Sequence, residues 1–193
     1  MIYYTSDLHF SHQNIIKFDG RPYNTVEQMN TDLINRWNSV VSNRDDVYVI
    51  GDMFWVPDEA PMILEQLNGK IHLIKGNHDK ISSDMMRYFS SISGYAELND
   101  TGRYVILCHY PIMFYNHSCM RNCWMLCGHV HNTRENTWLA KWKQDLRDGV
   151  MSMASNKGNI INVGCMLHDY TPQTLDQLIG WDKSEKWKED LRD

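Results

Sequence analysis

The chain has 193 residues, a length that suits one domain with a layered core. Its 19 Lys and Arg and 24 Asp and Glu give a net charge of −5, which disfavours non-specific binding to long nucleic acids or anionic membranes. Hydrophobic residues make up 42% of the chain, and no stretch approaches the ~20 apolar residues of a membrane span. We therefore expect a single globular domain over residues 1–193, with no membrane segment.

The cysteines and the N-terminal residues indicate a reduced, cytoplasmic protein. Five cysteines are an odd number and no Cys-x-x-Cys pair occurs, which is unlike a disulfide framework. Residues 1–7 have neither the basic nor the apolar region of a secretion signal. The spacing of Cys119, Cys123 and Cys127 would also allow a thiolate metal site, but the predicted strand among them favours buried or loop thiols.

Short apolar runs and helical patterns follow one another along the chain. Six runs are continuous rather than alternating, which is typical of strands covered on both faces: Ile2–Thr5, Val47–Ile50, Ile71–Ile74, Tyr104–Cys108, Trp124–Cys127 and Asn159–Val163. Apolar residues at helical spacing predict a helix from Val26 to Val41, with Asn24 as its N-cap. Shorter helices are predicted over Asp58–Leu67 and Ser83–Phe89.

The second half of the chain contains more strands and one segment that departs from the pattern. Predicted strands at Ile92–Leu98 and Arg103–Cys108 flank a turn sequence at residues 99–102, which indicates a β-hairpin. Residues 133–158 form a predicted surface insertion, in which Thr137 to Asp148 would be either an amphipathic helix or a lid. The fold class is therefore α/β, with sheet layers flanked by helices.

Residues of metal-binding types follow five of the predicted strands, at the point where each strand ends. In chain order they are Asp7 and His9, Asp52, Asn77 to Asp79, His109, and His129 and His131. The carboxyl ends of adjacent strands converge in α/β sheets, so we expect these side chains to meet in one region. Gly51, Gly76 and Gly128 would let the backbone turn tightly just before the ligands.

The residue types in this set indicate a metal site. Histidine and aspartate supply nitrogen and oxygen ligands and asparagine adds a neutral oxygen, a mixture that suits Mn, Fe, Zn or Ni. Seven candidates are too many for one ion: Asp7, His9, Asp52, Asn77, His109, His129 and His131. Two four-coordinate ions that share one carboxylate would use all seven, and Asp52, from a middle strand, is the natural bridge. The sequence predicts two divalent metal ions, with manganese favoured.

The five motifs together resemble a known family signature, although each motif alone is more often a turn. D-x-H, G-D, G-N-H-[DE], H and G-H-x-H are matched without a gap between Asp7 and His131, as in the calcineurin-like metallophosphoesterase superfamily. The residues from Ser6 to Ile16, with Arg21-Pro22, are also similar to small bacterial and phage phosphoesterases. The resemblance implies a four-layer α/β/β/α sandwich of two mixed sheets flanked by helices, with a dinuclear site between the sheets.

The resemblance also implies a role for each site residue. One metal would be held by Asp7, His9, Asp52 and His131. The other metal would be held by Asp52, Asn77, His109 and His129. His78 would be the catalytic histidine that is not a ligand, with Asp79 near it.

Such a site favours hydrolysis of phosphomonoesters or phosphodiesters. A metal-bridging hydroxide would attack phosphorus in line, while the ions stabilise charge on the phosphoryl oxygens. His78 would protonate the leaving oxygen, and Asp79 could hold the imidazole in its protonated form. Asn77, His12 and Arg21 are the candidate substrate-binding residues. For His12 a polar role at a helix start is an equal alternative, and for Arg21 a surface position is slightly favoured over bidentate phosphate binding.

Two other classes of function are weighed against a small phosphoester substrate. A nuclease could use residues of the predicted insertion to stack bases and hold phosphates: Trp138, Lys141, Trp142, Lys143 and Arg147. The net charge of −5 weighs against it. A non-catalytic scaffold is disfavoured because every motif position is filled. The natural substrate and the oligomeric state do not follow from these patterns.

Overall fold

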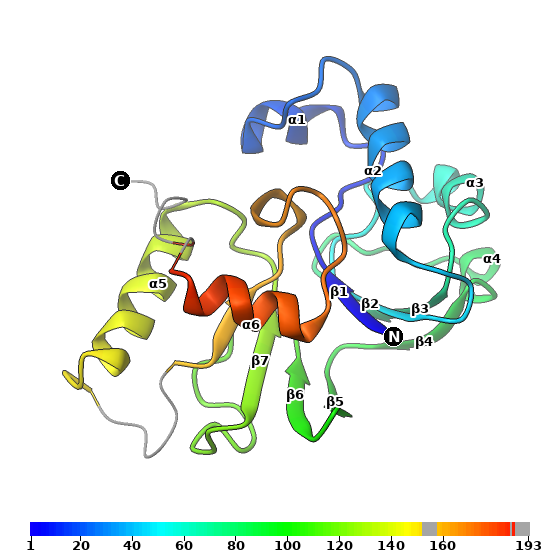
Figure 1. Ribbon diagram of the computed structural model, residues 1–193. Coiled ribbons are helices and arrows are strands. Elements are labelled where there is room, and N and C mark those ends of the chain that lie inside the picture. Colours follow the sequence, from blue (N-terminus) through cyan, green and yellow to red (C-terminus); the bar gives the residue numbers. More distant parts are fainter. Residues whose placement is uncertain (152–157, 186, 188–193) are drawn as a thin grey trace.

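The computed structural model describes residues 1–151, 158–185 and 187, and it contains two sheets of four strands (Figure 1). The first sheet has the order β1-β2-β3-β4 and the second the order β5-β6-β7-β8. The strands are β1 (Ile2–Thr5), β2 (Asp46–Ile50), β3 (Lys70–Ile74), β4 (Phe89–Ser93), β5 (Ala96–Asp100), β6 (Arg103–Leu107), β7 (Cys123–Cys127) and β8 (Ile160–Asn162).

Helices connect and cover these strands. The α-helices of the described residues are α1 (Gln13–Asp19), α2 (Val26–Val40), α3 (Ala60–Leu64), α4 (Ser83–Met86), α5 (Arg134–Arg147) and α6 (Leu175–Lys183). Two short 3₁₀ segments accompany them, η1 (Pro57–Glu59) and η2 (Cys165–Leu167). Within the described part of the chain, none of these helices has the length and apolar character needed to cross a membrane.

The first sheet is entirely parallel and only the second is mixed, whereas two mixed sheets were expected. The difference arises at Ile92–Leu98, which was predicted as one strand. The structure divides this run between β4 and β5, with a break at Gly94 and Tyr95. Strand β4 completes the first sheet and β5 begins the second, where it pairs antiparallel with β6 as the hairpin turn predicted.

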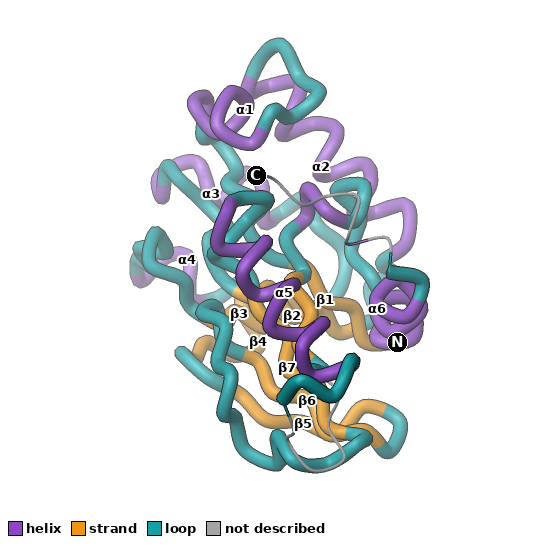
Figure 2. Tube along the Cα trace, turned by 90° about the vertical axis from the view of Figure 1, so that its left-hand side faces the viewer, coloured by secondary structure: helices purple, strands orange, loops and turns teal. Residues whose placement is uncertain are grey.

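Three buried apolar clusters separate four layers. The cluster between the sheets combines Tyr4, Ile50 and Ile74 of the first sheet with Val105, Leu107, Leu126 and Ile161 of the second. On the outer face of the first sheet, Met29, Leu33 and Trp37 of α2 pack against the strands. On the outer face of the second sheet, α5 lies across the strands (Figure 2) and contributes Leu139 and Trp142. The expected α/β/β/α sandwich is confirmed.

Several helix boundaries differ from those predicted. The N-cap of α2 is Thr25 rather than Asn24, and its hydroxyl accepts the N–H of Gln28 at 3.2 Å. The helix expected over Asp58–Leu67 ends at Leu64, after a 3₁₀ start. Helix α1 begins after His12, as the helix-start alternative for that residue expected, but its extent was not predicted, because one buried residue in seven gives it no apolar stripe.

The predicted insertion contributes a layer of the fold through α5. Its Lys143 is buried, and both Lys143 and Arg147 form ion pairs with Asp182 of α6. Asn136 of the same helix is hydrogen-bonded to Asn162 at the end of β8. The helix alternative for this segment is therefore the one found. Residues 152–157 of the predicted insertion lie outside the described residues.

None of the five cysteines, all within the described residues, forms a disulfide, and Cys123, Cys127 and Cys165 belong to the buried core. Cys123 and Cys127 lie in β7 and are buried against the second sheet, while Cys119 is exposed in the preceding loop. Burial raises the pKa of Cys123 to about 11 and also raises the pKa of Cys127. Both groups therefore remain thiols rather than thiolates, which supports the expectation of structural cysteines over a thiolate metal site.

Candidate metal centre and active site

Two loops that follow β1 and β2 are joined by backbone hydrogen bonds, and they carry the first predicted ligands. The N–H of Asp7 donates to the carbonyl of Gly51 at 3.0 Å, and the N–H of His9 donates to that of Asp52 at 3.0 Å. These bonds extend the parallel pairing of β1 with β2 beyond the strands. These hydrogen bonds therefore hold Asp7, His9 and Asp52 at fixed positions relative to one another.

The backbone of five predicted ligands lies in the left-handed region. The φ angles are 55° at Asp7, 49° at His9, 53° at Asp52, 70° at His129 and 43° at His131. Strained backbone of this kind costs about 1–3 kcal/mol per residue and persists where the surrounding structure enforces it, most often at functional sites. Five of the eleven non-glycine residues with a positive φ in the described part of the chain are predicted ligands, so strained backbone is frequent at these strand ends.

Four side chains form the first ligand group. Asp7, His9, Asp52 and His131 each offer one ligand atom, and these atoms all lie within 4.8 Å of one another. Nε2 of His9 is 3.2 Å from Nε2 of His131 and 3.7 Å from Oδ2 of Asp52. Nε2 of His131 is 3.5 Å from Oδ1 of Asp7. Two imidazole nitrogens and two carboxylates that face one point are a donor set that fits a divalent transition metal.

Three further predicted ligands form a second group beside Asp52. Oδ1 of Asn77 is 3.0 Å from Nε2 of His109 and 3.0 Å from Nδ1 of His129. Nε2 of His109 is 3.4 Å from Oδ2 of Asp52. The same carboxylate oxygen of Asp52 therefore borders both groups, and the structure brings all seven predicted ligands together.

The pKa shifts of Asp52 and His9 suit cation binding, whereas burial raises the pKa of Asp7, and hydrogen bonds to Asp52 and Asp19 outweigh burial and raise the pKa of His109 and His131. Burial alone would raise the pKa of Asp52, but the hydrogen bond from His109 and the N–H of His78 outweigh it and hold the pKa at about 2. Burial and the neighbouring His131 lower the pKa of His9 to about 2. An ionised aspartate and a neutral imidazole are the forms that bind metal ions.

Asp19 and Arg21 hold the first ligand group in place through hydrogen bonds to His131 and to the backbone of Asp7 and Leu8. Oδ1 of Asp19 accepts a hydrogen bond from Nδ1 of His131 at 2.8 Å, an arrangement that fixes the orientation of a metal-binding imidazole. The Arg21 guanidinium donates to Asp19 at 2.9 Å and to the carbonyls of Asp7 and Leu8, each at 2.8 Å. Arg21 is only 4% exposed, so the surface position expected from the sequence is wrong, and the same burial disfavours a direct contact with a phosphate.

Replacement of Arg21 by methionine should lower the free energy of unfolding by about 3–5 kcal/mol, because the buried Asp19 carboxylate loses its charged partner. Arg21→Lys should recover only part of this loss, since one ammonium cannot reproduce the forked contacts. Urea unfolding of the metal-free protein measures the effect, with the exposed Arg44→Met as control. Equal stabilities of the Arg21 and Arg44 variants would contradict the supporting role.

Gly76 and Gly128 are required for close approach rather than for a turn. A Cβ on Gly76 would lie 2.2 Å from Oδ1 of Asp52, and one on Gly128 would lie 2.5 Å from Oδ2 of Asp7. Gly51 has both constraints, with a φ of 87° and a Cβ that would lie 2.2 Å from Nδ1 of His109. The expectation of tight turns therefore holds for Gly51, while the other two glycines make room for ligand side chains.

Gly76→Ala should destabilise the protein by about 1–3 kcal/mol and weaken metal binding, because the new methyl group displaces the Asp52 carboxylate. Gly94→Ala is a matched control, since a Cβ on Gly94 would meet no atom beyond its chain neighbours within 4 Å. Thermal unfolding and metal titration of both variants measure the effect. Similar behaviour of the two variants would show that the Asp52 carboxylate tolerates displacement.

His78 presents an exposed imidazole beside the ligand cluster. Its backbone N–H donates to Oδ1 of Asp52 at 2.9 Å, and its ring centroid is 5.8 Å from that of His9. No hydrogen bond within the described part of the chain involves the His78 ring. The ring is therefore held near the cluster by its backbone and is open to a substrate.

Asp79 has a different role from the one expected, which was to hold the His78 imidazole protonated. Its buried carboxylate accepts the backbone N–H groups of Asp52 at 2.8 Å, Met53 at 2.9 Å and Gly76 at 2.8 Å. Asp79 therefore ties the loop after β2 to the loop after β3 and fixes the separation of the residues that these loops carry.

Two aromatic residues at the rim were missed by the sequence analysis. Trp55 stacks on the buried ring of His12, with centroids 3.8 Å apart and an angle of 5° between the planes. Tyr110 lies with its ring centroid 4.5 Å from that of His129. Both follow predicted ligands closely in the chain, and this proximity is the signal that could have found them.

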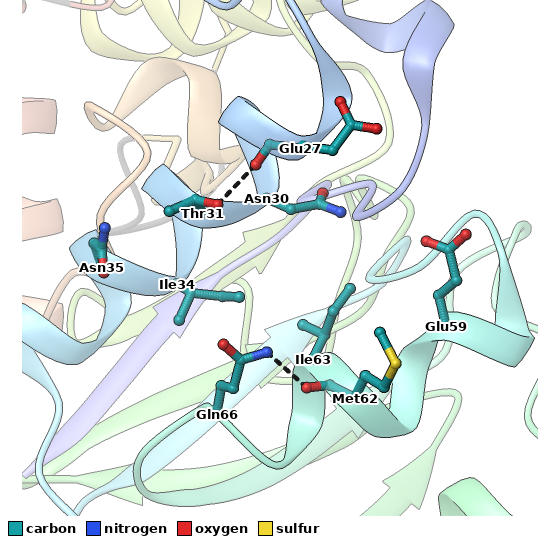
Figure 3. Close-up of a pocket in the computed structure, with 9 residues that line it drawn as sticks. All are labelled: Glu27, Asn30, Thr31, Ile34, Asn35, Glu59, Met62, Ile63 and Gln66. Carbon is teal, nitrogen blue, oxygen red and sulfur yellow. Dashed lines mark hydrogen bonds between the residues drawn. The ribbon is translucent and has the colours of Figure 1, made fainter.

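A groove lies between α2 and the η1–α3 segment (Figure 3). Its volume is about 320 Å³, and its lining includes Glu27, Ile34, Glu59 and Met62. None of the seven predicted ligands lines this groove. The chemistry of the chain therefore concentrates at the strand ends and not in this groove.

Comparison with known proteins places this site in a family. A model of the calcineurin-like phosphoesterase superfamily domain matches residues 1–168. The chain belongs to this superfamily. The shared chemistry of calcineurin-like phosphoesterases is hydrolysis of phosphoesters, and the Asp and His cluster described above is the candidate metal site of this member.

Individual relatives cover different shares of the chain. An uncharacterised protein from Methanocaldococcus jannaschii is 32% identical over 181 residues, which cover 92% of this chain and 89% of that protein. The gene 66 protein of Mycobacterium phage L5 is 29% identical over 89 residues, or 40% of this chain and 39% of that protein. A protein of unknown function from Aquifex aeolicus shares the fold, with a TM-score of 0.68, 24% identity and coverage of 93% and 98% of the two chains.

Proposed function

We propose that this calcineurin-like phosphoesterase uses two divalent metal ions, with manganese favoured, to hydrolyse small phosphomonoesters or phosphodiesters. The observation that carries the proposal is the position of Asp52, whose Oδ2 lies 3.7 Å from Nε2 of His9 and 3.4 Å from Nε2 of His109. The first ion would be held by Asp7, His9, Asp52 and His131. The second ion would be held by Asp52, Asn77, His109 and His129.

When bound, the ions would lower the pKa of a water molecule toward ~7 and neutralise charge on the phosphoryl oxygens. The residues of the chain supply orientation and a proton. The His78 imidazole, exposed beside the cluster, donates a proton to the leaving oxygen as its bond to phosphorus breaks. Asp79 keeps the loops of Asp52 and His78 at a fixed separation, and Asp19 keeps the His131 ring in its orientation.

The alternative of a nuclease has less support in the fold than in the sequence. Lys143 is 4% exposed and pairs with Asp182, as does Arg147, while Trp142 packs against the second sheet. Of the five residues that a nuclease could use, only Trp138 and Lys141 are exposed. We therefore favour a small phosphoester, and five cysteines without a disulfide suit a reducing compartment such as the cytoplasm.

Saturation with Mn²⁺ should load two ions per chain, because the seven ligands form two groups that share Asp52. Elemental analysis after removal of free metal measures the ratio. His117→Asn, at an exposed histidine outside the cluster, should retain both ions. A ratio of one ion per chain, unchanged in activity by further Mn²⁺, would contradict the dinuclear site.

The proposed activity is tested by turnover of a panel of phosphoesters with Mn²⁺, Zn²⁺, Ni²⁺ or Fe²⁺. The panel should include phosphomonoesters, cyclic nucleotides, dinucleotides and short oligonucleotides. We expect turnover of small esters that depends on added metal and is lost with a chelator. Absence of turnover for every ester with every metal would contradict the proposal.

A further inference from the structure

Three aromatic side chains form a row beside the His78 imidazole. The Trp55 ring centroid is 4.9 Å from that of His78 and 6.4 Å from that of His9. His12 stacks flat on Trp55, and Phe18 meets His12 edge-on with centroids 6.3 Å apart. The group that protonates the leaving oxygen therefore has an indole as its neighbour, so the leaving group itself must lie beside Trp55.

Trp55 is held by backbone hydrogen bonds between the same two loops as the first ligands. The backbone N–H of Trp55 donates to the carbonyl of Phe10 at 2.9 Å, and the backbone N–H of Phe10 donates to the carbonyl of Met53 at 2.9 Å. Both bonds belong to the set of backbone hydrogen bonds that joins the loops after β1 and β2. The buried His12 ring then fixes the indole from one side. A ring held in this way loses little conformational freedom when a ligand binds to it.

Trp55 is nevertheless 44% exposed, so its fixed ring remains accessible to a ligand. A flat aromatic surface in water is a stacking platform for planar rings such as nucleobases. A flexible aliphatic alcohol could cover much less of this surface. The exposed indole of Trp55 therefore favours a leaving group that carries a planar ring.

We propose that Trp55 stacks on the nucleobase of a nucleoside phosphoester, so that a ribose oxygen is the leaving group next to His78. This inference rests on the proposed phosphoesterase function. The bond between phosphorus and the ribose oxygen breaks, water supplies the new oxygen on phosphorus, and His78 supplies the proton on the ribose oxygen. The net charge of −5 and the ion pairs of Lys143 and Arg147 with Asp182 favour a small nucleotide over a long strand.

The test compares adenosine 5′-monophosphate with ribose 5-phosphate, which share the leaving oxygen and differ by the base. For the manganese-loaded wild type, kcat/KM should be about 10-fold to 100-fold higher for the nucleotide, the range that stacking of one base on an aromatic ring provides. Trp55→Leu should bring the ratio of the two kcat/KM values close to one, and Trp55→Phe should retain part of it. Trp138→Leu, at another exposed tryptophan, should leave the ratio unchanged.

The ratio separates stacking from an indirect effect on His78. If Trp55 only positioned the catalytic imidazole, Trp55→Leu would lower kcat for both esters equally and keep the ratio, and that result would overturn the inference. Tighter competition by a single-stranded oligonucleotide than by adenosine 5′-monophosphate would overturn the choice of a small nucleotide.

The test also separates this inference from the proposed function. If neither ester is hydrolysed with any metal, the proposed function fails for these substrates. Calorimetric affinities of the two esters for the wild type and Trp55→Leu then decide the stacking role. Tighter binding of the nucleotide that disappears in Trp55→Leu supports it, and equal affinities of the two esters for the wild type overturn it.

Discussion

Asp52→Asn should lower phosphoester turnover by at least about 10²-fold, the loss that removal of a single electrostatic contact at an active site causes. The reason is the place of the Asp52 carboxylate, whose Oδ2 borders Nε2 of both His9 and His109. An amide there removes one of the two aspartate charges of the cluster and turns one side of the group into an N–H donor. The affinity for both metal ions should fall, and metal titration measures this together with turnover.

The fold of the Asp52→Asn variant should survive, so the loss can be assigned to the site. The Asn side chain can still offer Oδ1 to the backbone N–H of His78, the hydrogen bond that Oδ1 of Asp52 accepts at 2.9 Å. Asp58→Asn, an exposed residue beyond the same loop, is the matched control and should keep wild-type metal content and turnover. Wild-type turnover and full metal content in Asp52→Asn would show that this carboxylate is not shared between two ions.

The ligands were predictable because strand ends and ligand residues have local signals. Continuous apolar runs mark β1, β2, β3, β6 and β7, and the polar residues that follow each run are adjacent in the chain. Strands β1, β2 and β3 are parallel neighbours in the first sheet and β6 and β7 in the second, so the carboxyl ends of each set meet at one edge of their sheet. The packing of the two sheets then brings the two edges together.

The residues that support the ligands have no such signal. Asp19 and Arg21 lie at and just after the end of α1, a helix with one buried residue, and the burial of Arg21 depends on the fold around it. The strained φ angles of Asp7 and His131 likewise result from tertiary contacts that no local propensity encodes. Asp79 shows the same limit, because its partners are backbone N–H groups of two different loops.

Loss of the His78 imidazole should affect substrates according to the basicity of their leaving groups. A nitrophenolate departs readily without a proton, so His78→Ala should reduce its release only slightly. An alkoxide such as a ribose oxygen needs a proton, and general acid catalysis contributes about 10²–10⁴-fold. The measurement compares kcat for an aryl and an alkyl ester of the same phosphate in the wild type and in His78→Ala.

The position of His78 makes the comparison decisive, because its ring is exposed and only its backbone N–H contacts the Asp52 carboxylate. His78→Ala keeps that backbone bond, so metal content should stay at the wild-type level. A much larger loss with the alkyl ester supports proton donation to the leaving oxygen. Equal losses with both esters would assign His78 to stabilisation of charge on the phosphoryl oxygens instead, since that charge develops whatever the leaving group. A fall in bound metal would make His78 a ligand, in conflict with the distances that place the six other predicted ligands around Asp52.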